Sequence, residues 1–198
     1  MSDEKNDVNL TLVNVNRKGV YILKIHDLTQ VAIGAALLAS IGSIAIPIGP
    51  VPITLQMLGI MTVASVLGAK KGGLAVVVYL LLGLIGLPVL SGSGGLAPFV
   101  GPTVGYLIAF PIVAFLIGWL SERHRTFPAL VAYNILIGLG FVYVVGSLGL
   151  QAVFGLTFID ALKVNIPFIL GDLIKAVLAA AIAYKVSTNP QMRRTLAS

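Results

Sequence analysis

Six long apolar runs dominate this chain of 198 residues. A helix that crosses the hydrocarbon core of a bilayer needs about 20 residues, within a range of about 17–25. Most of the runs fit or nearly fit this length, whereas the second is short. The sequence therefore predicts an all-α integral membrane protein with six transmembrane helices, at approximately Leu28–Ile46, Ile53–Leu67, Gly73–Leu90, Pro98–Leu120, Phe127–Leu150 and Ile166–Val186.

The low content of charged residues supports this fold class. Only 10% of the residues are charged, against about 25% in an average soluble protein. So few charges cannot cover the surface of a soluble domain of this size, which argues against a water-soluble enzyme. The net charge of +6 is scattered in short clusters, with no basic stripe interleaved with aromatic residues. No nucleic-acid partner is therefore expected.

The distribution of Lys and Arg predicts the orientation in the membrane, because cytoplasmic loops carry an excess of these residues. The predicted loops and termini on one side of the membrane contain ten Lys and Arg residues, whereas the other side contains only Lys163. Both termini are therefore expected in the cytoplasm, with an N-terminal segment at 1–27, a membrane domain at 28–187 and a tail at 188–198. The residues assigned to the cytoplasmic side are Arg17, Lys18, Lys24, Lys70, Lys71, Arg123, Arg125, Lys185, Arg193 and Arg194.

Three outer loops follow from this orientation, at about 47–52, 91–97 and 151–165. The first two are uncharged and rich in Gly and Pro, although an exposed loop normally carries charge. Apolar non-helical backbone at this depth is tolerated where protein or a cavity satisfies its amides. These loops are expected to cap an outward-facing pocket; the alternative is two tight turns held by proline.

Two charges fall inside a predicted span, Asp172 and Lys175. Their i, i+3 spacing places them on one face of a helix. With Asn165 as the helix cap, the two residues lie about 10 Å and about 15 Å along the helix, in the outer half of the membrane. Charges inside a membrane are costly and commonly mark a binding site or a pathway. The alternative is a neutral pair that only holds helices together.

Other polar residues at membrane depth are less specific. Gln56 lies one turn inside the second span, where an amide either binds a ligand or joins helices. Thr103 and Tyr106 follow the second outer loop and are expected to reach the same cavity. Tyr143 lies near the outer face, where an interfacial aromatic belt is a sufficient explanation. Asn134 lies closer to the cytoplasmic end, where it is expected to join helices.

Small residues and missing motifs complete the pattern. Ala32 and Ala36 in the first span permit close approach of another helix, either within the bundle or on a separate subunit. The chain contains no G-x-x-x-x-G-K-[ST] motif for binding ATP. It has no Cys, and its two His residues lie near the cytoplasmic ends, so no metal site is expected. The pattern indicates a binding pocket without catalytic or energy-coupling machinery.

Several motifs resemble a known family when they are taken in order. They are Gly49–Gln56 (GPVPITLQ), Leu67–Gly72 (LGAKKG), Tyr79–Val89 (YLLLGLIGLPV), Gly94-Gly95 and Gly101–Leu107 (GPTVGYL). The last span adds an acidic residue three positions before a lysine, at Asp172 and Lys175. The family that these motifs resemble is BioY, the biotin-specific substrate-binding (S) components of energy-coupling-factor (ECF) transporters. The resemblance covers about residues 28–187.

The resemblance implies a six-helix S component in a prokaryotic cell membrane that captures biotin from outside. A transmembrane coupling subunit and two cytoplasmic ATPases would supply the energy, so this chain itself takes no cofactor. Subunit docking maps onto Ala32 and Ala36. In the pocket, Asp172 and Lys175 would hold polar groups of biotin, and the other candidate contacts are Gln56, Ser91, Ser93, Gly94, Gly95, Thr103, Tyr106 and Tyr143.

Three other functions compete with this interpretation. The first is an S component for another small vitamin. The second is a facilitator that works without partner subunits. The third is a small intramembrane enzyme that uses Asp172 as a base.

Overall fold

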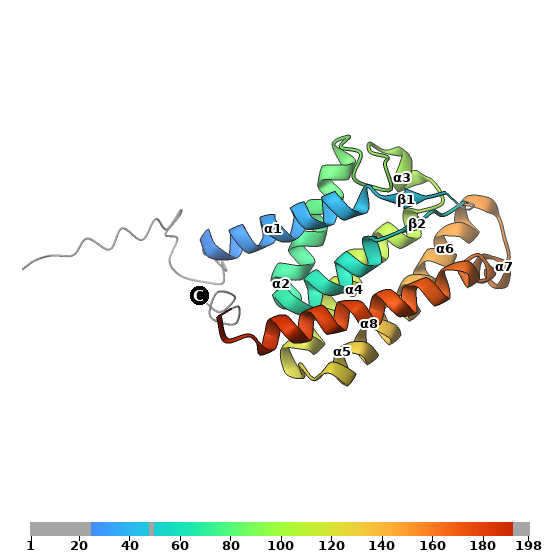
Figure 1. Cartoon of the computed structure of the whole chain (residues 1–198). Helices are drawn as coiled ribbons and strands as arrows, with labels where there is room; N and C mark the ends of the chain where they lie inside the picture. Colours follow the sequence, from blue (N-terminus) through green and yellow to red (C-terminus); the bar gives the residue numbers. More distant parts are fainter. Residues whose placement is uncertain (1–24, 48–49, 192–198) are drawn as a thin grey trace, which may run out of the picture.

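The computed structural model describes residues 25–47 and 50–191 of the chain. The predicted N-terminal segment and C-terminal tail therefore lie largely outside the described residues. Helices make up nearly all of the regular structure (Figure 1). In chain order the elements are α1 (Ile25–Gly42), β1 (Ala45–Ile46), β2 (Ile53–Thr54), α2 (Gln56–Leu84), α3 (Ala97–Val100), α4 (Val104–Arg123), α5 (Phe127–Tyr133), the π-helical segment η1 (Asn134–Phe141), α6 (Val142–Phe154), α7 (Phe158–Lys163) and α8 (Ile166–Thr188).

Among the residues that the structure describes, five helical stretches are long and apolar enough to cross a membrane: α1, α2, α4, α5 through α6, and α8. Two of the six predicted spans are joined in α2, which bends back on itself at Gly68. The Gln56 amide donates to the Tyr79 hydroxyl over 2.6 Å, although a straight helix would separate these residues by about 34 Å. The two arms of α2 therefore run side by side in opposite directions.

The bend at Gly68 depends on a backbone conformation that is strained for any residue with a side chain. Gly68 has φ 82° and ψ −177°, a region occupied almost only by glycine. The Glu122 carboxylate on α4 accepts a 2.9 Å hydrogen bond from the backbone amide of Ala69, which begins the second arm. A neighbouring helix thus supplies the N-terminal cap that the new arm needs.

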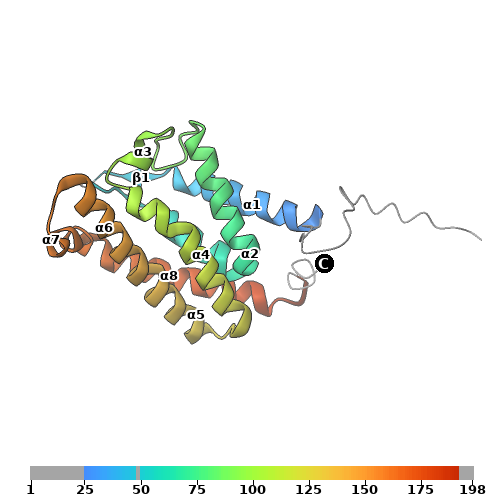
Figure 2. The ribbon, with the colours of Figure 1, turned by 180° about the vertical axis from the view of Figure 1, so that it is seen from behind.

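The bundle packs around α2, which contacts α1, α4 and α8 (Figures 1 and 2). Its centre contains Ile60, Met61, Val76 and Val113, all fully buried. Two other helices, α4 and α6, approach each other closely because Gly149 faces Gly105: a Cβ on Gly149 would lie 2.6 Å from the Gly105 nitrogen. Small residues at such a contact permit dense packing where lipid removes the hydrophobic drive for association.

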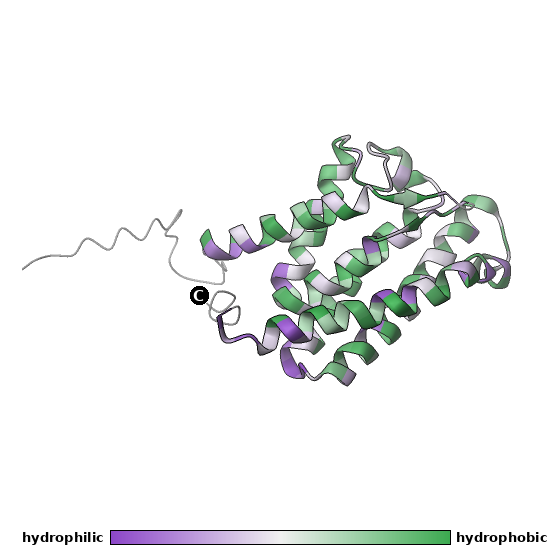
Figure 3. Ribbon diagram, in the orientation of Figure 1, coloured by the Kyte–Doolittle hydropathy of each residue, from purple (hydrophilic) through white to green (hydrophobic). Residues whose placement is uncertain are grey.

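Apolar residues predominate along the helices (Figure 3), and many of the large ones are exposed on the bundle. Leu170 and Leu136 are more than 70% exposed, and Ile33 and Ile108 are more than half exposed. Lipid-facing helices are expected to have this surface. With the five candidate spans, it identifies the chain as membrane-embedded.

Several predicted helix ends are wrong, because apolar runs do not distinguish a buried loop from a helix. Residues 53–54 form β2, which pairs antiparallel with β1 instead of starting a helix. The third run continues to Leu90, but α2 ends at Leu84, and Leu90 is buried in a turn. The fourth run starts at Pro98, but α4 starts at Val104, after the break at Gly101-Pro102.

Two features of the remaining part of the chain, the π-helical segment η1 and the short helix α7, were not predicted. The fifth run is continuous but contains η1, where Asn134 donates from its amide to the Ala176 carbonyl of α8 over 3.0 Å. Asn134 thus joins helices, as expected from the sequence. The segment 151–165, predicted as a loop, contains α7, in which hydrogen bonds from Lys163 and Thr157 hold the pKa of Asp160 below its usual value.

We expect Gly68→Ala to destabilise the protein. The new methyl group would overlap the Glu122 carboxylate, and the φ, ψ pair disfavours any side chain. The cost is about 1–3 kcal/mol from backbone strain alone, measurable as a lower midpoint of thermal unfolding in detergent.

Gly171→Ala is the matched control, since a Cβ there meets no atom within 4 Å and Gly171 lies within α8. This variant should unfold at the wild-type temperature or slightly above it. Equal midpoints for the two variants would contradict the role of Gly68.

Candidate functional site

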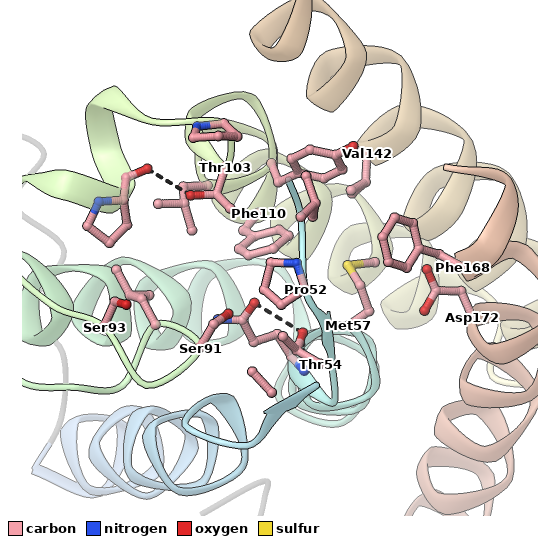
Figure 4. A pocket seen from close by; sticks show the side chains of 18 of the residues that line it. Pro52, Thr54, Met57, Ser91, Ser93, Thr103, Phe110, Val142, Phe168 and Asp172 are labelled. Atoms are coloured by element: carbon pink, nitrogen blue, oxygen red, sulfur yellow. Dashed lines mark hydrogen bonds between the residues drawn. The ribbon is translucent and has the colours of Figure 1, made fainter. Parts of the chain in front are cut away.

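A pocket of about 470 Å³ lies at the end of the bundle that carries β1 and β2 (Figure 4). Small-molecule pockets commonly enclose about 300–1,000 Å³. Its walls come from α2, α4, α6 and α8 and from the segments that precede α2 and α4. The polar side chains among its lining residues are Thr54, Gln56, Ser91, Ser93, Thr103, Tyr106, Tyr143, Asp172 and Lys175.

The charged part of the pocket is a buried ion pair. The Lys175 ammonium lies 2.8 Å from Oδ1 of Asp172, and the two side chains are only 12% and 8% exposed. Both residues lie on α8, where their spacing of three places them on one face, as predicted. Figure 4 shows Asp172 and Phe168 from α8 opposite Met57.

Partners from other segments complete this ion pair. The Lys175 ammonium also donates to the Thr54 carbonyl over 2.6 Å. The Tyr143 hydroxyl donates to Oδ2 of Asp172 over 2.8 Å. An interfacial aromatic belt therefore does not explain Tyr143. These hydrogen bonds use two of the three ammonium protons and one lone pair on each carboxylate oxygen, which leaves both groups able to bind a ligand.

Gln56 joins helical segments, the second of the two roles predicted for it, and it also lines the pocket. Its amide nitrogen donates to Tyr79 on the other arm of α2, and its amide oxygen accepts from the Thr54 hydroxyl over 3.2 Å. Tyr79 in turn donates to the Val89 carbonyl over 2.9 Å. Gln56 therefore joins the two arms of α2 at the edge of the site.

Tyr106 belongs to a polar cluster that the sequence did not reveal. Its hydroxyl donates to Oδ1 of Asn165 over 2.7 Å, and the Asn165 amide donates to the Ser147 hydroxyl over 3.0 Å. Asn165 precedes α8 as predicted, but its side chain does not cap that helix. Instead it joins α4 and α6 beneath the pocket wall. The signal available in the sequence was the position of Asn165 among apolar neighbours.

The segment before α4 contributes side chains to the pocket, and its two adjacent glycines make backbone contacts. Ser91 and Ser93 line the pocket, as does Thr103, whose hydroxyl donates to the Pro98 carbonyl. Gly94 and Gly95, which were predicted to contact a ligand, are not among the lining residues. A Cβ on Gly94 would overlap the Gly86–Leu87 backbone, and the Gly95 amide donates to the Gly83 carbonyl over 2.8 Å.

Most of the remaining lining is apolar. The apolar groups of the lining come mainly from the segment between β1 and β2 and from four helices. A ligand that matches this pocket has polar groups at one position and a hydrophobic body elsewhere. The apolar residues include Pro47, Val51, Pro52, Met57, Leu107, Phe110, Val142 and Phe168.

Ala32 and Ala36 lie on the exposed face of α1. The opposite face of this helix packs on α2 through Gly34, Ala35 and Leu38, which are buried. Packing within the bundle therefore does not explain the Ala32/Ala36 pair. The two residues face outward, where a helix of another protein has access to them.

The fold and the site together define a class of protein. A bundle of membrane-spanning helices surrounds a pocket at one end, and the pocket combines a buried ion pair with apolar walls. This is a membrane-embedded protein that binds a small amphipathic solute.

Comparisons with known proteins agree with this class. The model of the BioY family matches residues 13–191, and the chain belongs to this family. It is 42% identical over 159 residues to the biotin transporter BioY2 of Lactococcus lactis, covering 78% of this chain and 86% of that protein. It is also 42% identical over 168 residues to the biotin transporter BioY of Thermotoga maritima, covering 81% and 95%.

A solved structure shares the fold. The crystal structure of the S-component for biotin from an ECF-type ABC transporter superposes with a TM-score of 0.79 at 38% sequence identity. The match covers 84% of this chain and 93% of that chain. The relatives are transporters, not enzymes, and an intramembrane enzyme with Asp172 as its base is therefore set aside.

We expect Lys175→Met to destabilise the ligand-free protein by about 3 kcal/mol, because it leaves a buried carboxylate without its cation. The double variant Asp172→Asn/Lys175→Met should recover most of this loss, since it leaves no unpaired charge. Thermal unfolding in detergent measures both effects.

Lys163→Met provides the control, because Lys163 and Asp160 form an exposed pair with the same spacing of three. Its unfolding midpoint should stay close to that of the wild type. A double variant as unstable as Lys175→Met would refute the electrostatic explanation.

Proposed function

We propose that this chain captures biotin with high affinity from outside the cell, as the S component of an ECF-type transporter. One observation carries the proposal: the pocket places the Asp172–Lys175 pair among apolar walls. Membership of the BioY family and the likeness to biotin transporters support the same ligand.

The chemistry of biotin is complementary to this pocket. Biotin has a ureido group with two N–H donors and one carbonyl, a carboxylate at the end of its tail, and an apolar thiophane ring and chain. The free lone pairs of Asp172 suit the ureido N–H groups, and the remaining Lys175 proton suits a carbonyl or carboxylate oxygen. Tyr143 and Thr54 hold the two charged groups in place, so little side-chain freedom is lost on binding.

We expect purified protein to bind radiolabelled biotin stoichiometrically, and Asp172→Asn and Lys175→Ala each to weaken binding by about a hundredfold. Loss of one member of a buried charge pair typically has an effect of this size. The controls are Asp160→Asn and Lys163→Ala, in the exposed pair of α7, which should bind normally. Competition by other unlabelled vitamins tests the ligand assignment. Failure of well-folded wild-type protein to bind biotin would refute it.

Transport requires partners in this proposal. A transmembrane coupling subunit and two cytoplasmic ATPases supply the energy, so ATP is used by those subunits and this chain takes no cofactor. The absence of a P-loop motif from the sequence fits this division of labour. The relatives compared above come from prokaryotes, which favours a prokaryotic plasma membrane, with the pocket facing outward and both termini in the cytoplasm.

The coupling subunit docks on the exposed Ala32/Ala36 face of α1. Small side chains there allow close approach of a partner helix, and the face lies on the opposite side of α1 from its packing with α2. ATP hydrolysis in the partner subunits then tilts the S component in the membrane and presents the pocket to the cytoplasm.

We expect Ala32→Trp to keep biotin binding by the isolated protein and to abolish uptake by cells that also express the coupling subunit and ATPases. The large ring would prevent close helix contact without reaching the pocket. Ala152→Trp, at an exposed position of α6, should preserve both activities. Loss of both activities in Ala32→Trp, or of neither, would count against the docking face. Uptake by wild-type protein without the ATPases would indicate a facilitator.

A further inference from the structure

The hydroxyl of Tyr79 connects the two outer segments that line the pocket. Tyr79 lies in the second arm of α2 and is fully buried. Its hydroxyl accepts from the Gln56 amide over 2.6 Å and donates to the Val89 carbonyl over 2.9 Å. Tyr79 is not among the lining residues, so it acts on the site through its neighbours.

The first connection leads to the charged group. Gln56 accepts from the Thr54 hydroxyl, and the Thr54 carbonyl accepts from Lys175. Thr54 belongs to β2, which pairs with β1. Four residues thus form a continuous path from the Tyr79 hydroxyl to the Lys175 ammonium.

The second connection leads to the serines of the other outer segment. Directly after Val89, Leu90 and Ser93 exchange two backbone hydrogen bonds of 3.0 and 2.9 Å. Ser91 and Gly92 between them have φ of 57° and 78°, the positive values required in a type I′ turn. The Val89 carbonyl therefore fixes the start of a tight turn that presents Ser91 and Ser93 to the pocket.

We propose that Tyr79 is a positioning residue that couples the Thr54 side of the pocket to the Ser91–Ser93 turn, so that both sides hold a bound ligand together. The inference rests on the proposed function for its ligand. The coupling itself is a property of the ligand-free protein. Without the hydroxyl, the Gln56 amide and the Val89 carbonyl lose their shared buried partner, and the link between the two segments weakens.

Tyr79→Phe tests the proposal because it removes one oxygen and keeps the packed ring. In ligand-free protein in lipid nanodiscs, amide hydrogen exchange should rise in both segments, at β1 and β2 and at Leu90–Ser93. Biotin dissociation should become about tenfold faster, as expected for loss of buried hydrogen bonds. Association should stay within about twofold, because most effects on affinity fall on dissociation.

Two further variants separate coupling from a general loss of stability. Gln56→Leu breaks the path from the Thr54 side and should raise exchange at Leu90–Ser93, the reciprocal effect that coupling requires. Tyr184→Phe removes the same oxygen about 18 Å further along α8 from Asp172, at a 41% exposed residue. It should change neither exchange nor dissociation.

Each outcome decides the proposal. Increased exchange in both segments with faster dissociation supports it. Increased exchange in only one segment, or unchanged dissociation from Tyr79→Phe, overturns it. If wild-type protein binds no biotin, the proposed function fails, and the exchange measurements still decide whether Tyr79 couples the two segments.

Discussion

The ion pair between Asp172 and Lys175 determines the polar organisation of the site. A charged group at membrane depth is costly unless partners replace its water, and a buried pair needs further hydrogen bonds to offset desolvation. Here Tyr143 from α6 and the Thr54 backbone from β2 provide them. The pair thus brings α6, α8 and the segment before α2 to one point. Apolar walls complete the pocket, and the charged groups able to recognise a polar part of a ligand lie where these segments meet.

The bend of α2 is the second requirement, because it brings Gln56 and Tyr79 together across 23 positions of sequence. The φ of Gly68 permits the reversal, and Glu122 caps the arm that follows it. This capping contact lies at the bend of α2, whereas the Gln56–Tyr79 contact closes the other end of the hairpin. The geometry of the pocket edge therefore depends on a glycine one helix length away.

Sequence reasoning found the charged centre because two charges inside an apolar run are conspicuous. It also found most of the polar lining, since Thr103, Tyr106, Ser91 and Ser93 flank loops that cap the pocket. It did not find the roles of Asn165, Ser147 and Tyr79, whose partners are distant in sequence and become neighbours only through helix packing. A glycine pair indicates close backbone approach, and at Gly94 the approaching backbone is that of Gly86 and Leu87 in the chain itself.

The position of α1 relates its exposed alanine face to the pocket. This helix packs mainly on α2, and its exposed alanines lie on the opposite side from that contact. Its C-terminal residue, Gly42, nevertheless meets the site: the Gly42 carbonyl accepts from the Ser91 amide over 2.9 Å, and a Cβ on Gly42 would overlap the Tyr79 hydroxyl. The end of α1 is therefore in direct contact with the Ser91–Ser93 turn and with Tyr79. The absence of a side chain on Gly42 is what allows the end of α1 to lie against the residue that contacts both sides of the pocket.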